Sequence, residues 1–341
     1  MTPKWTAADI PDQHGRTAVV TGANSGIGFF AARELARAGA RVLLAVRNAE
    51  KGAEAARAIQ AAVPNAEIEI GSLDLASLAS VRSFADWFAR EHDGLDLLIN
   101  NAGTMAFSPR RETADGFEMS LGTNHLGHFA LTGLLLGRME GRQDARVVTI
   151  SGALHRMGRI NFDDLQRERR YGRWSAYAQS KLAVLLFAFE LDRRLRAAGS
   201  AVRSLAAHPG YAATNIQTAA ATSKLDRFFG KIAGNRLFAQ SAEMGALPVL
   251  YAATCPGLEG GAHIGPGSFF ESRGYPKQGA GSSAAARDEA VARKLWEVSE
   301  GITGVRFQVL GGNGGPLHVP EQPAAREVPP EQVEAGETPT V

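Results

Sequence analysis

The sequence contains a tyrosine and a lysine whose spacing suits proton transfer. Tyr177 and Lys181 are four residues apart at the start of an apolar segment that predicts a helix, so the two side chains share one face. The phenol of tyrosine has a pKa of about 10, which makes it a poor base at neutral pH. A neighbouring cation stabilises tyrosinate and lowers that pKa. The pair therefore predicts a general acid/base, although the same spacing also occurs in ordinary helices.

A glycine-rich loop earlier in the chain predicts a phosphate-binding turn. It joins a short apolar segment, Ala18–Thr21, to a helical segment, Phe29–Ala38. Glycine lets backbone N–H groups approach a pyrophosphate, and the helix N-terminus adds aligned donors and a positive dipole. Between a strand and a helix we expect a dinucleotide site rather than a turn without a ligand. Its predicted cofactor-binding residues are Gly22, Asn24, Ser25, Gly26, Ile27 and Gly28.

The residue after the second predicted strand distinguishes between the two nicotinamide cofactors. In dinucleotide folds an acid at this place binds the adenosine ribose, whereas an arginine accepts a 2′-phosphate. Arg47 stands there and no acid does, so the sequence predicts NADP(H); an exposed arginine at a helix start is the alternative. The ends of the next two strands are expected to complete the site, with Asp74 meeting the adenine amino group. These further residues are Asp74, Leu75, Asn101, Ala102 and Gly103.

Six predicted strands position these residues. Short β-rich apolar segments alternate with longer segments of helical period from Thr17 to about Leu205, which is the pattern of an α/β protein. We therefore expect a doubly wound parallel sheet, the Rossmann fold, in a single domain with right-handed crossovers. The predicted strands are Ala18–Thr21, Arg41–Val46, Glu67–Gly71, Leu95–Asn100, Arg146–Ser151 and Val202–Ala207.

The pattern changes after the sixth predicted strand. Helices are expected at Ser241–Ala253 and from about Ala286 to Ser299, with a Gly-rich stretch, Gly257–Gly267, between them. The last 31 residues contain one Arg, five Glu and six of the 15 prolines, so we predict disorder there. The predicted parts are 1–14 (N-terminal extension), 15–310 (Rossmann-type domain with a small C-terminal substrate cap at about 211–240) and 311–341 (disordered Pro/Glu-rich tail).

Composition limits the possible compartment and partners. The 341 residues are 45% hydrophobic and 21% charged, enough for a sizeable core. The lone cysteine, Cys255, excludes an intrachain disulfide, and no Cys/His cluster has metal-ligand spacing, so we expect no metal. We see neither a signal peptide nor an apolar stretch of the ~18 residues that a membrane span needs, and we predict a cytoplasmic protein. A net charge of +2 predicts no nucleic-acid partner, and the arginines from Arg167 to Arg173 favour a solvated loop over an anion site.

The order of these motifs resembles the classical type of the short-chain dehydrogenase/reductase family from about Gly15 to Phe307. The glycine loop is followed by Asn100-Asn-Ala-Gly103, then by Asn124, by Tyr177 with Lys181, and by Pro209-Gly210. Within the family the chain resembles the retinol dehydrogenase and WW-domain oxidoreductase branch. The segments with this narrower likeness are Thr113–Glu118, Asn124–Phe129, Phe162–Gln166 and Lys294–Ser299.

This resemblance implies hydride transfer between NADP(H) and a carbonyl/alcohol pair, as in a carbonyl reductase. Tyr177 would donate the proton, Lys181 would activate it, and Asn124 would hold a backbone water in a proton relay. Three residues after the sixth strand would contact the nicotinamide carboxamide. They are Pro209, Gly210 and Thr214.

The chain departs from the family at the end of the fifth predicted strand. Family members have two serines there, and the second hydrogen-bonds the substrate oxygen and the tyrosine; this chain has Ser151-Gly152. We favour a local shift at Gly152 that turns Ser151 into the site as the fourth catalytic residue. Alternatively His155 substitutes, or catalysis is impaired. Losing one such donor typically costs ~10²–10³ in rate, so turnover can survive.

Apolar side chains near the predicted site suggest a hydrophobic carbonyl or alcohol as substrate, although they could equally be ordinary lid packing. Two other functions stay open: an NADP(H)-binding regulatory protein with weakened catalysis, and reduction of a carbon–carbon double bond on the same fold. A homodimer paired through the helices at Phe117–Leu136 and Trp174–Leu195 is an alternative to a monomer. The apolar residues are Met105, Phe107, Leu154, Met157, Tyr211, Phe228 and Phe229.

Overall fold

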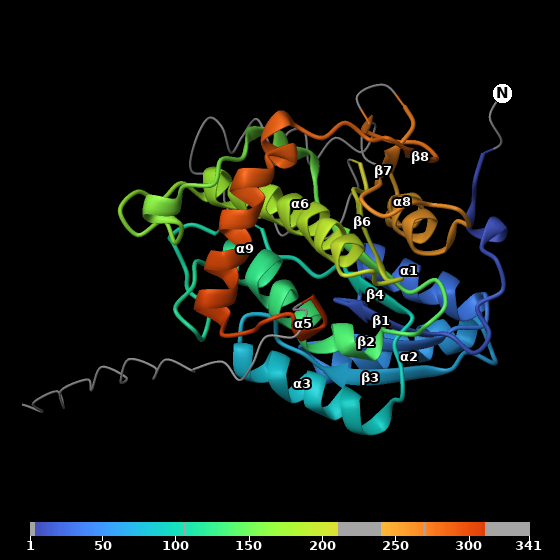
Figure 1. The fold of residues 1–341 in the computed structure, drawn as a ribbon. Coiled ribbons are helices and arrows are strands. Elements are labelled where there is room, and N and C mark those ends of the chain that lie inside the picture. Colours follow the sequence, from blue (N-terminus) through green and yellow to red (C-terminus); the bar gives the residue numbers. More distant parts are fainter. Residues whose placement is uncertain (1–3, 106, 211–239, 269–270, 311–341) are drawn as a thin grey trace, which may run out of the picture.

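A single sheet of eight strands lies at the centre of the part of the chain that the structure describes (Figure 1). The computed structural model describes residues 4–105, 107–210, 240–268 and 271–310. The strand order is β3-β2-β1-β4-β5-β6-β7-β8, and every pair is parallel except β7 with β8. The strands are β1 (Thr17–Thr21), β2 (Arg41–Val46), β3 (Ile68–Ser72), β4 (Leu97–Asn100), β5 (Arg146–Ile150), β6 (Arg203–Ala207), β7 (His263–Pro266) and β8 (Pro276–Gln278).

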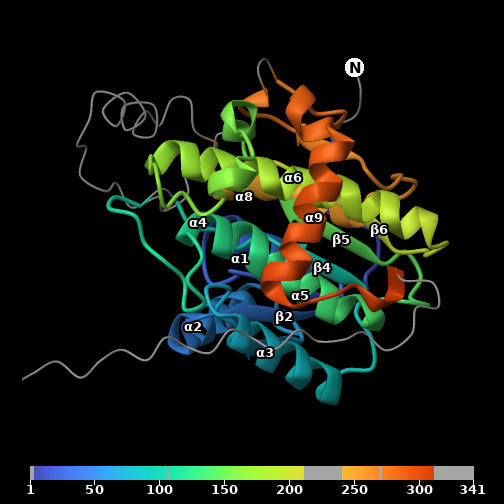
Figure 2. The ribbon, with the colours of Figure 1, turned by 60° about the vertical axis from the view of Figure 1, so that its left-hand side comes forward.

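Helices cover both faces of this sheet (Figures 1 and 2). Side chains of α1, α2 and α8 form one apolar core with the sheet, and those of α3, α5 and α6 form another on the opposite face. The predicted doubly wound Rossmann fold in a single domain is therefore confirmed. The helices are α1 (Gly26–Arg37), α2 (Ala49–Ala62), α3 (Leu78–Glu91), α4 (Met119–Leu121), α5 (Gly127–Leu135), α6 (Arg173–Ala197), α8 (Ala242–Thr254) and α9 (Glu289–Thr303).

The central strands are buried on both sides. Leu97, Leu98 and Ile99 follow one another in β4, and each has no exposed surface. Successive side chains of a strand point to opposite faces, so a continuous apolar run fits only a strand with helices on both sides. This is why periodicity located these strands in the sequence to within one or two residues.

The strand order reverses at β1, which pairs with both β2 and β4. In an open α/β sheet, the helices that follow the two central strands leave on opposite faces, and a crevice opens at the carboxyl ends of those strands. Thr21 ends β1 and Asn100 ends β4 at this point. The glycine loop and the Asn-Asn-Ala-Gly segment therefore meet at one edge of the sheet.

The sequence did not predict β7 and β8. β7 lies inside the Gly-rich stretch and pairs in parallel with β6, and β8 closes the edge antiparallel to β7. Strands of four and three residues are too short to show an alternating pattern, so only their pairing defines them.

Some predicted parts fall wholly or partly outside the described residues. Nearly all of the expected cap at 211–240 and the expected tail at 311–341 lie there. The predicted N-terminal extension contacts the domain, since the ring of Trp5 meets Tyr251 edge-on at 5.2 Å between centroids. Within the described ranges, no helix is both long and apolar enough to cross a bilayer.

Candidate active site

The glycine loop after β1 is shaped by close backbone contacts. Gly22 and Gly26 have φ of +66° and +58°, a conformation that side-chain-bearing residues rarely adopt. A Cβ on Gly28 would collide with the Asn101 amide and lie 2.7 Å from the Gly22 carbonyl oxygen. Only glycine at position 28 allows α1 to pack this closely on the loop.

The N-terminus of α1 has no side-chain cap. Ser25 stands at the N-cap position, yet its hydroxyl makes no capping hydrogen bond to the first turn. Five other helices are capped by their N-cap side chains, whereas α5 and α6 also have no such cap. The first-turn N–H groups of α1 are thus open to the phosphate groups of a dinucleotide, which such a turn binds through its N–H groups and dipole. The capping residues elsewhere are Asn48 (α2), Ser77 (α3), Glu118 (α4), Ser241 (α8) and Asp288 (α9).

Thr21 joins the ends of β1 and β4. Its Oγ1 accepts hydrogen bonds from the backbone N–H groups of Asn101 and Ala102, both at 2.9 Å. The Asn101 amide in turn donates to the Thr21 carbonyl oxygen at 2.7 Å. These contacts fix the predicted cofactor residues Asn101 and Ala102 beside the glycine loop.

The adenine end of the expected cofactor site is less enclosed. Arg47 follows β2 with its side chain exposed, and the register of β1 and β2 pairs Thr21 with Ala45, so Arg47 lies at the same edge as the glycine loop. One Asp74 carboxylate oxygen accepts from the Ala76 N–H at 3.0 Å. Arg47 is therefore available to an anion beside this edge.

Tyr177 and Lys181 lie on α6 as the sequence predicts. The Lys181 Nζ is 5.9 Å from the centroid of the Tyr177 ring and donates to the Ile150 carbonyl oxygen at 3.2 Å. A Cβ on Gly103 would be 3.6 Å from this Nζ and 3.3 Å from the Asn124 Oδ1. The structure thus brings Lys181, Asn124 and Gly103, which are far apart in sequence, into one site.

Burial sets the protonation of the two groups on α6. It raises the pKa of the Tyr177 phenol to about 12 and lowers the pKa of the Lys181 ammonium to about 8. The sequence predicted that Lys181 lowers the pKa of Tyr177, but in this structure burial shifts that pKa the opposite way. Tyr177 therefore holds its proton at neutral pH and is ready to donate it.

Asn124 lies in a π-helical turn, Gly122–Leu126, just before α5. Such turns interrupt a helix and often occur at functional sites. The Asn124 Oδ1 accepts from the Thr104 N–H at 2.8 Å, and its Nδ2 donates to the Thr104 carbonyl oxygen at 3.1 Å and the Ser180 Oγ at 2.9 Å. The side chain thus joins the loop after β4 to α6, while the predicted backbone water relay stays a prediction.

The end of β5 does not have the arrangement that we favoured. The Ser151 Oγ donates to the Lys181 carbonyl oxygen at 2.9 Å, so this hydroxyl faces the backbone of α6 instead of turning toward Tyr177. The adjacent Gly152 has extended backbone, with φ of −163°, and a Cβ there would meet nothing within 4 Å. Because successive side chains alternate in extended chain, Ser151 cannot also occupy the place of residue 152.

His155 also points away from the expected substrate position. Its Nδ1 is 2.8 Å from the Gly152 carbonyl oxygen, and its buried ring lies 6.1 Å from that of His263. The centroid of the His208 ring is 5.4 Å from that of His263, and the His208 Nε2 is 3.1 Å from a carboxylate oxygen of Glu271. His155 therefore belongs to a buried histidine cluster at the β5–β7 edge, made of His155, His208 and His263.

The predicted nicotinamide loop begins directly after this cluster. Gly210 has φ of +67° and donates its N–H to His208 Nδ1 at 3.2 Å, and the Pro209 carbonyl oxygen accepts from the Gln240 amide. Thr214, predicted to contact the nicotinamide, lies outside the described residues. Hydrogen bonds to His208 and Gln240 thus fix the described part of this loop.

The substrate side is described only in part. The Tyr171 hydroxyl donates to the Phe107 carbonyl oxygen at 2.8 Å, which joins the loop after β4 to the segment before α6. Met157 is 67% exposed, an unusual position for a large apolar side chain. Of the other expected substrate residues, Met105 and Leu154 are partly buried, whereas Tyr211, Phe228 and Phe229 lie outside the described residues.

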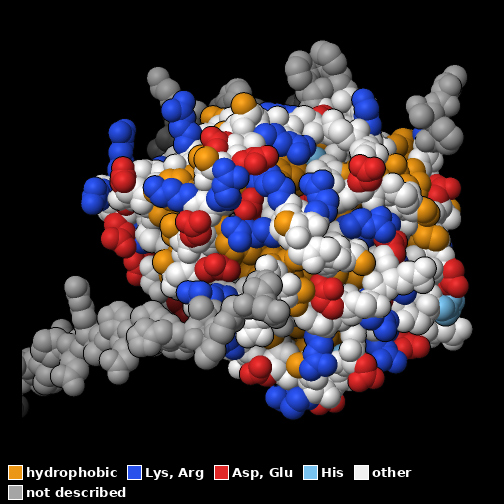
Figure 3. Space-filling model, viewed as in Figure 1, with side chains coloured by type: hydrophobic (Ala, Val, Ile, Leu, Met, Phe, Trp, Pro, Cys, Tyr) orange, Lys and Arg blue, Asp and Glu red, His pale blue; other side chains and the backbone are white. Residues whose placement is uncertain are grey.

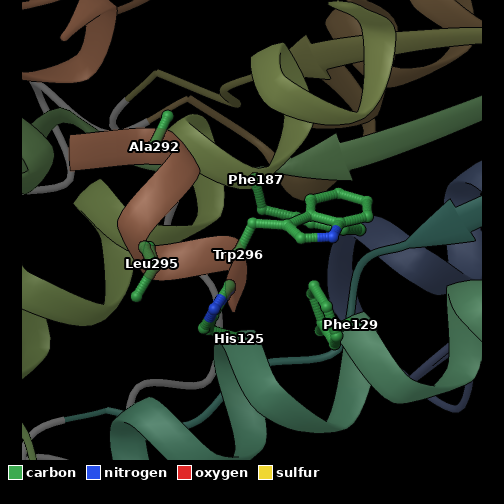
Figure 4. Close-up of a pocket in the computed structure, with 6 residues that line it drawn as sticks. All are labelled: His125, Phe129, Phe187, Ala292, Leu295 and Trp296. Atoms are coloured by element: carbon green, nitrogen blue, oxygen red, sulfur yellow. The ribbon is translucent and has the colours of Figure 1, made fainter. Parts of the chain in front are cut away.

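A small pocket between α5, α6 and α9 is lined mainly by packed aromatic rings (Figure 4). The rings of Phe187 and Trp296 stack at 5.9 Å, and Trp296 meets Phe129 edge-on at 5.1 Å. The His125 Nε2 is 2.9 Å from the Ser299 Oγ on α9. The Lys294–Ser299 segment thus holds α9 against α5 and α6, and this pocket belongs to the core rather than to the substrate site.

Charged side chains of both signs share the face that contains α6 and α9 (Figure 3). On α6, Glu190 pairs with Arg193 and Arg194, and Asp192 pairs with Arg196. In the run that starts at Arg167, backbone N–H groups bind the Asp164 carboxylate. In the described ranges, no group of three His, Cys, Asp or Glu residues is arranged to hold a metal ion.

Two residues of the site were missed from the sequence. Thr21 precedes the glycine loop, and Ser180, between Tyr177 and Lys181, donates to the Tyr177 carbonyl oxygen at 2.8 Å. Their neighbouring positions in the two motifs could have suggested them. Their roles depend on contacts with distant segments, which the sequence pattern does not show.

Comparison with known proteins agrees with this geometry. The sequence profile described as short chain dehydrogenase matches residues 16–224. Mouse retinol dehydrogenase 11 is 43% identical over 291 residues, 85% of this chain and 87% of that protein. A crystal structure of an uncharacterised protein from Mycobacterium paratuberculosis is 47% identical with a TM-score of 0.74 and covers 89% of this chain and 99% of that one.

A third comparison concerns a structure with its cofactor. It comes from Beutenbergia cavernae and is described as an NAD(P)-dependent gluconate 5-dehydrogenase with bound NADP at low occupancy. It is 30% identical with a TM-score of 0.55 and covers 71% of this chain and 91% of that one. The likeness thus extends over most of both chains.

Proposed function

The chain belongs to the short-chain dehydrogenase family, within its retinol dehydrogenase branch, and so to the oxidoreductases of the alcohol/carbonyl type; we propose that it uses NADP(H). In this proposal Tyr177 is the general acid/base, and the substrate is a hydrophobic small molecule. The observation that supports it most is the arrangement of residues at the carboxyl ends of the parallel strands. There a protonated Tyr177 with a neighbouring lysine lies near a glycine loop whose helix has no side-chain cap.

The choice of NADP(H) over NAD(H) rests on Arg47. It is the residue after β2 where an acid would bind the ribose hydroxyls, and its guanidinium is exposed at the right edge. A guanidinium can bind a 2′-phosphate through two parallel hydrogen bonds, whereas NAD(H) offers it no such group. The bound NADP of the Beutenbergia structure agrees with this choice.

The proposed contacts to the cofactor come from the loops that follow several of the parallel strands. The first turn of α1 would bind the pyrophosphate, Asp74 the adenine amino group, and Asn101, Ala102 and Gly103 would lie beneath the nucleotide. Pro209, Gly210 and Thr214 would contact the nicotinamide carboxamide. When bound, the nicotinamide supplies or accepts the hydride.

Proton transfer is assigned to α6. In reduction, Tyr177 donates its phenolic proton to the substrate oxygen, and in oxidation tyrosinate takes that proton back. Lys181, fixed by the Ile150 carbonyl oxygen, stabilises the tyrosinate formed in reduction. Asn124 keeps the loop after β4 in contact with α6. It thereby fixes the position of the proton donor relative to Asn101, Ala102 and Gly103, which we call the cofactor floor.

The substrate class is proposed from the residues around the site and from the relatives. Phe107 and the exposed Met157 border the described part, and relatives named retinol dehydrogenase share about two fifths of their residues with this chain. We therefore propose a hydrophobic aldehyde, ketone or alcohol. Ser151 then acts through its bond to α6, and substrate polarisation falls to Tyr177.

The test is NADPH oxidation by wild-type protein and Tyr177→Phe against a panel of hydrophobic aldehydes and ketones. We expect turnover with the wild type, a loss of about 10²–10⁴-fold in kcat for Tyr177→Phe, and equal NADPH binding by both. Tight NADPH binding with no turnover on a broad panel would instead support a regulatory binding protein. A product reduced at a carbon–carbon double bond would support the other enzyme class.

Location and assembly are proposed on weaker grounds. We keep the expectation of a cytoplasmic protein, and fractionation of the source cells would test it. A homodimer through α5 and α6 is likewise a proposal. Most apolar residues of α6 are already buried within one chain, which favours the monomer as the alternative. Light scattering of the purified protein would decide between monomer and dimer.

A further inference from the structure

His128 lies between the cofactor loops and the π-helical turn, a position that the proposed mechanism does not use. It is the second residue of α5, and its side chain is buried. The imidazole Nδ1 is 3.0 Å from the Asn124 carbonyl oxygen, and the Nε2 is 2.9 Å from the Thr21 Oγ1. One ring therefore contacts both the start of the glycine loop and the residue that joins the loop after β4 to α6.

The partners determine which ring nitrogen holds the proton. A carbonyl oxygen can only accept, so Nδ1 must be protonated and donate to Asn124. The neutral ring then offers a lone pair at Nε2, which accepts from the Thr21 hydroxyl at 2.9 Å, a shorter contact than the 3.3 Å from the same hydroxyl to the Ile99 carbonyl oxygen. Thr21 accepts two backbone N–H groups at the same oxygen, so each group in this small network has its partner.

The network continues to the proton donor. The Asn124 side chain donates to the Ser180 hydroxyl, and this hydroxyl donates to the Tyr177 carbonyl oxygen. A continuous series of hydrogen bonds thus runs from the backbone of Asn101 through Thr21 and His128 to the Asn124 backbone, and from the Asn124 side chain to α6.

The environment of His128 keeps the ring neutral. Burial, together with the charge of Lys181 from α6, lowers the pKa of His128 to about 4, although its bond to Asn124 opposes the shift. The other titratable group that faces it is His125, whose pKa burial lowers to about 3. A neutral ring is the state that can donate at one nitrogen and accept at the other.

We propose that His128 is a positioning residue that holds the Asn124 turn against the cofactor floor and so aligns Tyr177 and Lys181 with the nicotinamide. The proposal rests on the function proposed above. Its reason is geometric: α6 and the β1–β4 edge share no covalent link nearby, and a misplacement of about 1 Å at a reacting group can cost 10²-fold in rate. The buried histidines His125, His155 and His263 each have one ring nitrogen without a hydrogen-bond partner among the described residues, whereas His128 uses both.

Three substitutions separate the two contacts. The amide nitrogen in His128→Asn occupies the place of Nδ1 and keeps the bond to Asn124, whereas the longer amide in His128→Gln reaches the place of Nε2 and keeps the bond to Thr21. His128→Phe keeps a ring of similar size and loses both bonds. We expect kcat at saturating NADPH to fall about 10- to 100-fold in all three variants, because each loses at least one of the two bonds by which His128 joins the Asn124 turn to Thr21.

NADPH affinity should separate the variants. We expect a weaker Kd, measured by cofactor fluorescence, in the Asn and Phe variants and an unchanged Kd in the Gln variant, because only Gln keeps the bond to Thr21. A kcat within about threefold of wild type in the Asn or the Gln variant, or parallel losses of kcat, Kd and thermal stability in all three, would show a packing role and overturn the proposal.

A spectroscopic measurement tests the geometry independently of activity. A long-range 1H–15N spectrum of the imidazoles, with His128→Phe for assignment, should show His128 protonated at Nδ1 only, and the other tautomer would overturn the proposal. If the His128 variants do not fold, Thr21→Val removes the hydroxyl that contacts the His128 Nε2, together with its bonds to Asn101 and Ala102. Thr21→Ser keeps the hydroxyl and is the control. Wild-type protein that binds no NADPH would refute the proposed function itself, and with it this role.

Discussion

The carboxyl ends of β4 and β5 are neighbours in the sheet, yet they are organised in opposite ways. After β4, the N–H groups of Asn101 and Ala102 bind the Thr21 hydroxyl, and the Thr104 backbone is bound at both its N–H and its carbonyl oxygen by Asn124. After β5, Ser151 binds away from the site and Gly152 faces open space. In the proposed site, internal hydrogen bonds thus fix the cofactor side, whereas residue 152 on the substrate side offers no hydroxyl donor.

This difference separates two tasks of the site. Binding a dinucleotide needs a rigid set of backbone donors, and in the proposed cofactor site the side chains of Thr21 and Asn124 fix these groups. Polarising a substrate oxygen needs one donor at one place, and residue 152 supplies only a hydrogen. We infer that the missing serine lowers the rate of the chemical step and leaves cofactor binding intact.

The largest effect that would sharpen this comparison is a gain of activity. Gly152→Ser should raise kcat by about 100-fold on a substrate that the wild type turns over, because one added donor to a developing oxyanion typically contributes 10²–10³. The added side chain meets nothing within 4 Å and the backbone there is extended, so the variant should fold. Steady-state NADPH oxidation measures the change.

Gly152→Ala is the matched control for that gain, because it adds the Cβ without the hydroxyl. It should leave kcat near the wild-type value. If the serine variant gains nothing, or if both variants lose activity, the space at Gly152 accommodates the substrate and the contrast between the two strand ends is wrong.

A second prediction concerns the cofactor side. Arg47→Ala should weaken NADPH binding by about 10- to 100-fold, the usual contribution of hydrogen bonds to a charged group, and should leave NADH binding nearly unchanged. Arg57→Ala is the control, since Arg57 is also exposed and lies further along α2. Titration of cofactor fluorescence gives both constants, and equal losses for the two cofactors would remove Arg47 from the site.

A third prediction uses pH to test the substrate-side edge. Burial lowers the pKa of His208 to about 4 and of His263 to about 3, whereas an unfolded histidine titrates near 6.5. The unfolded chain therefore binds more protons below pH 6.5, and the free energy of unfolding should fall by about 1.4 kcal/mol per pH unit for each ring between pH 6.5 and about 4.

Urea unfolding at pH 7, 6 and 5 measures this slope. In His263→Phe the slope should be shallower by the share of one ring, about 1.4 kcal/mol per pH unit. The same slope in variant and wild type would mean that His263 is already protonated in the folded protein. The histidine cluster would then not make the stability of the β5–β7 edge depend on pH in the predicted way.

The sequence by itself determined the fold class, most strands and the candidate site. Apolar runs located most of β1 to β6 because these strands are buried on both faces, although the edge strand β3 is only partly buried. The glycine loop, Asn100-Asn-Ala-Gly103, Tyr177 and Lys181 were recognisable because each is a local pattern. Local patterns survive in sequence when the chemistry needs residues a few positions apart. The order of these motifs then showed the family.

Only the tertiary structure decided where the individual side chains point. Ser151 was expected in the site but binds α6, and the roles of Thr21 and His128 depend on partners up to 107 residues away. The strands β7 and β8 exist through their pairing with a neighbour rather than through any periodicity of their own. The physical reason is common to all three: a hydrogen bond is fixed by the position of both partners, and the sequence near one partner holds no record of the other.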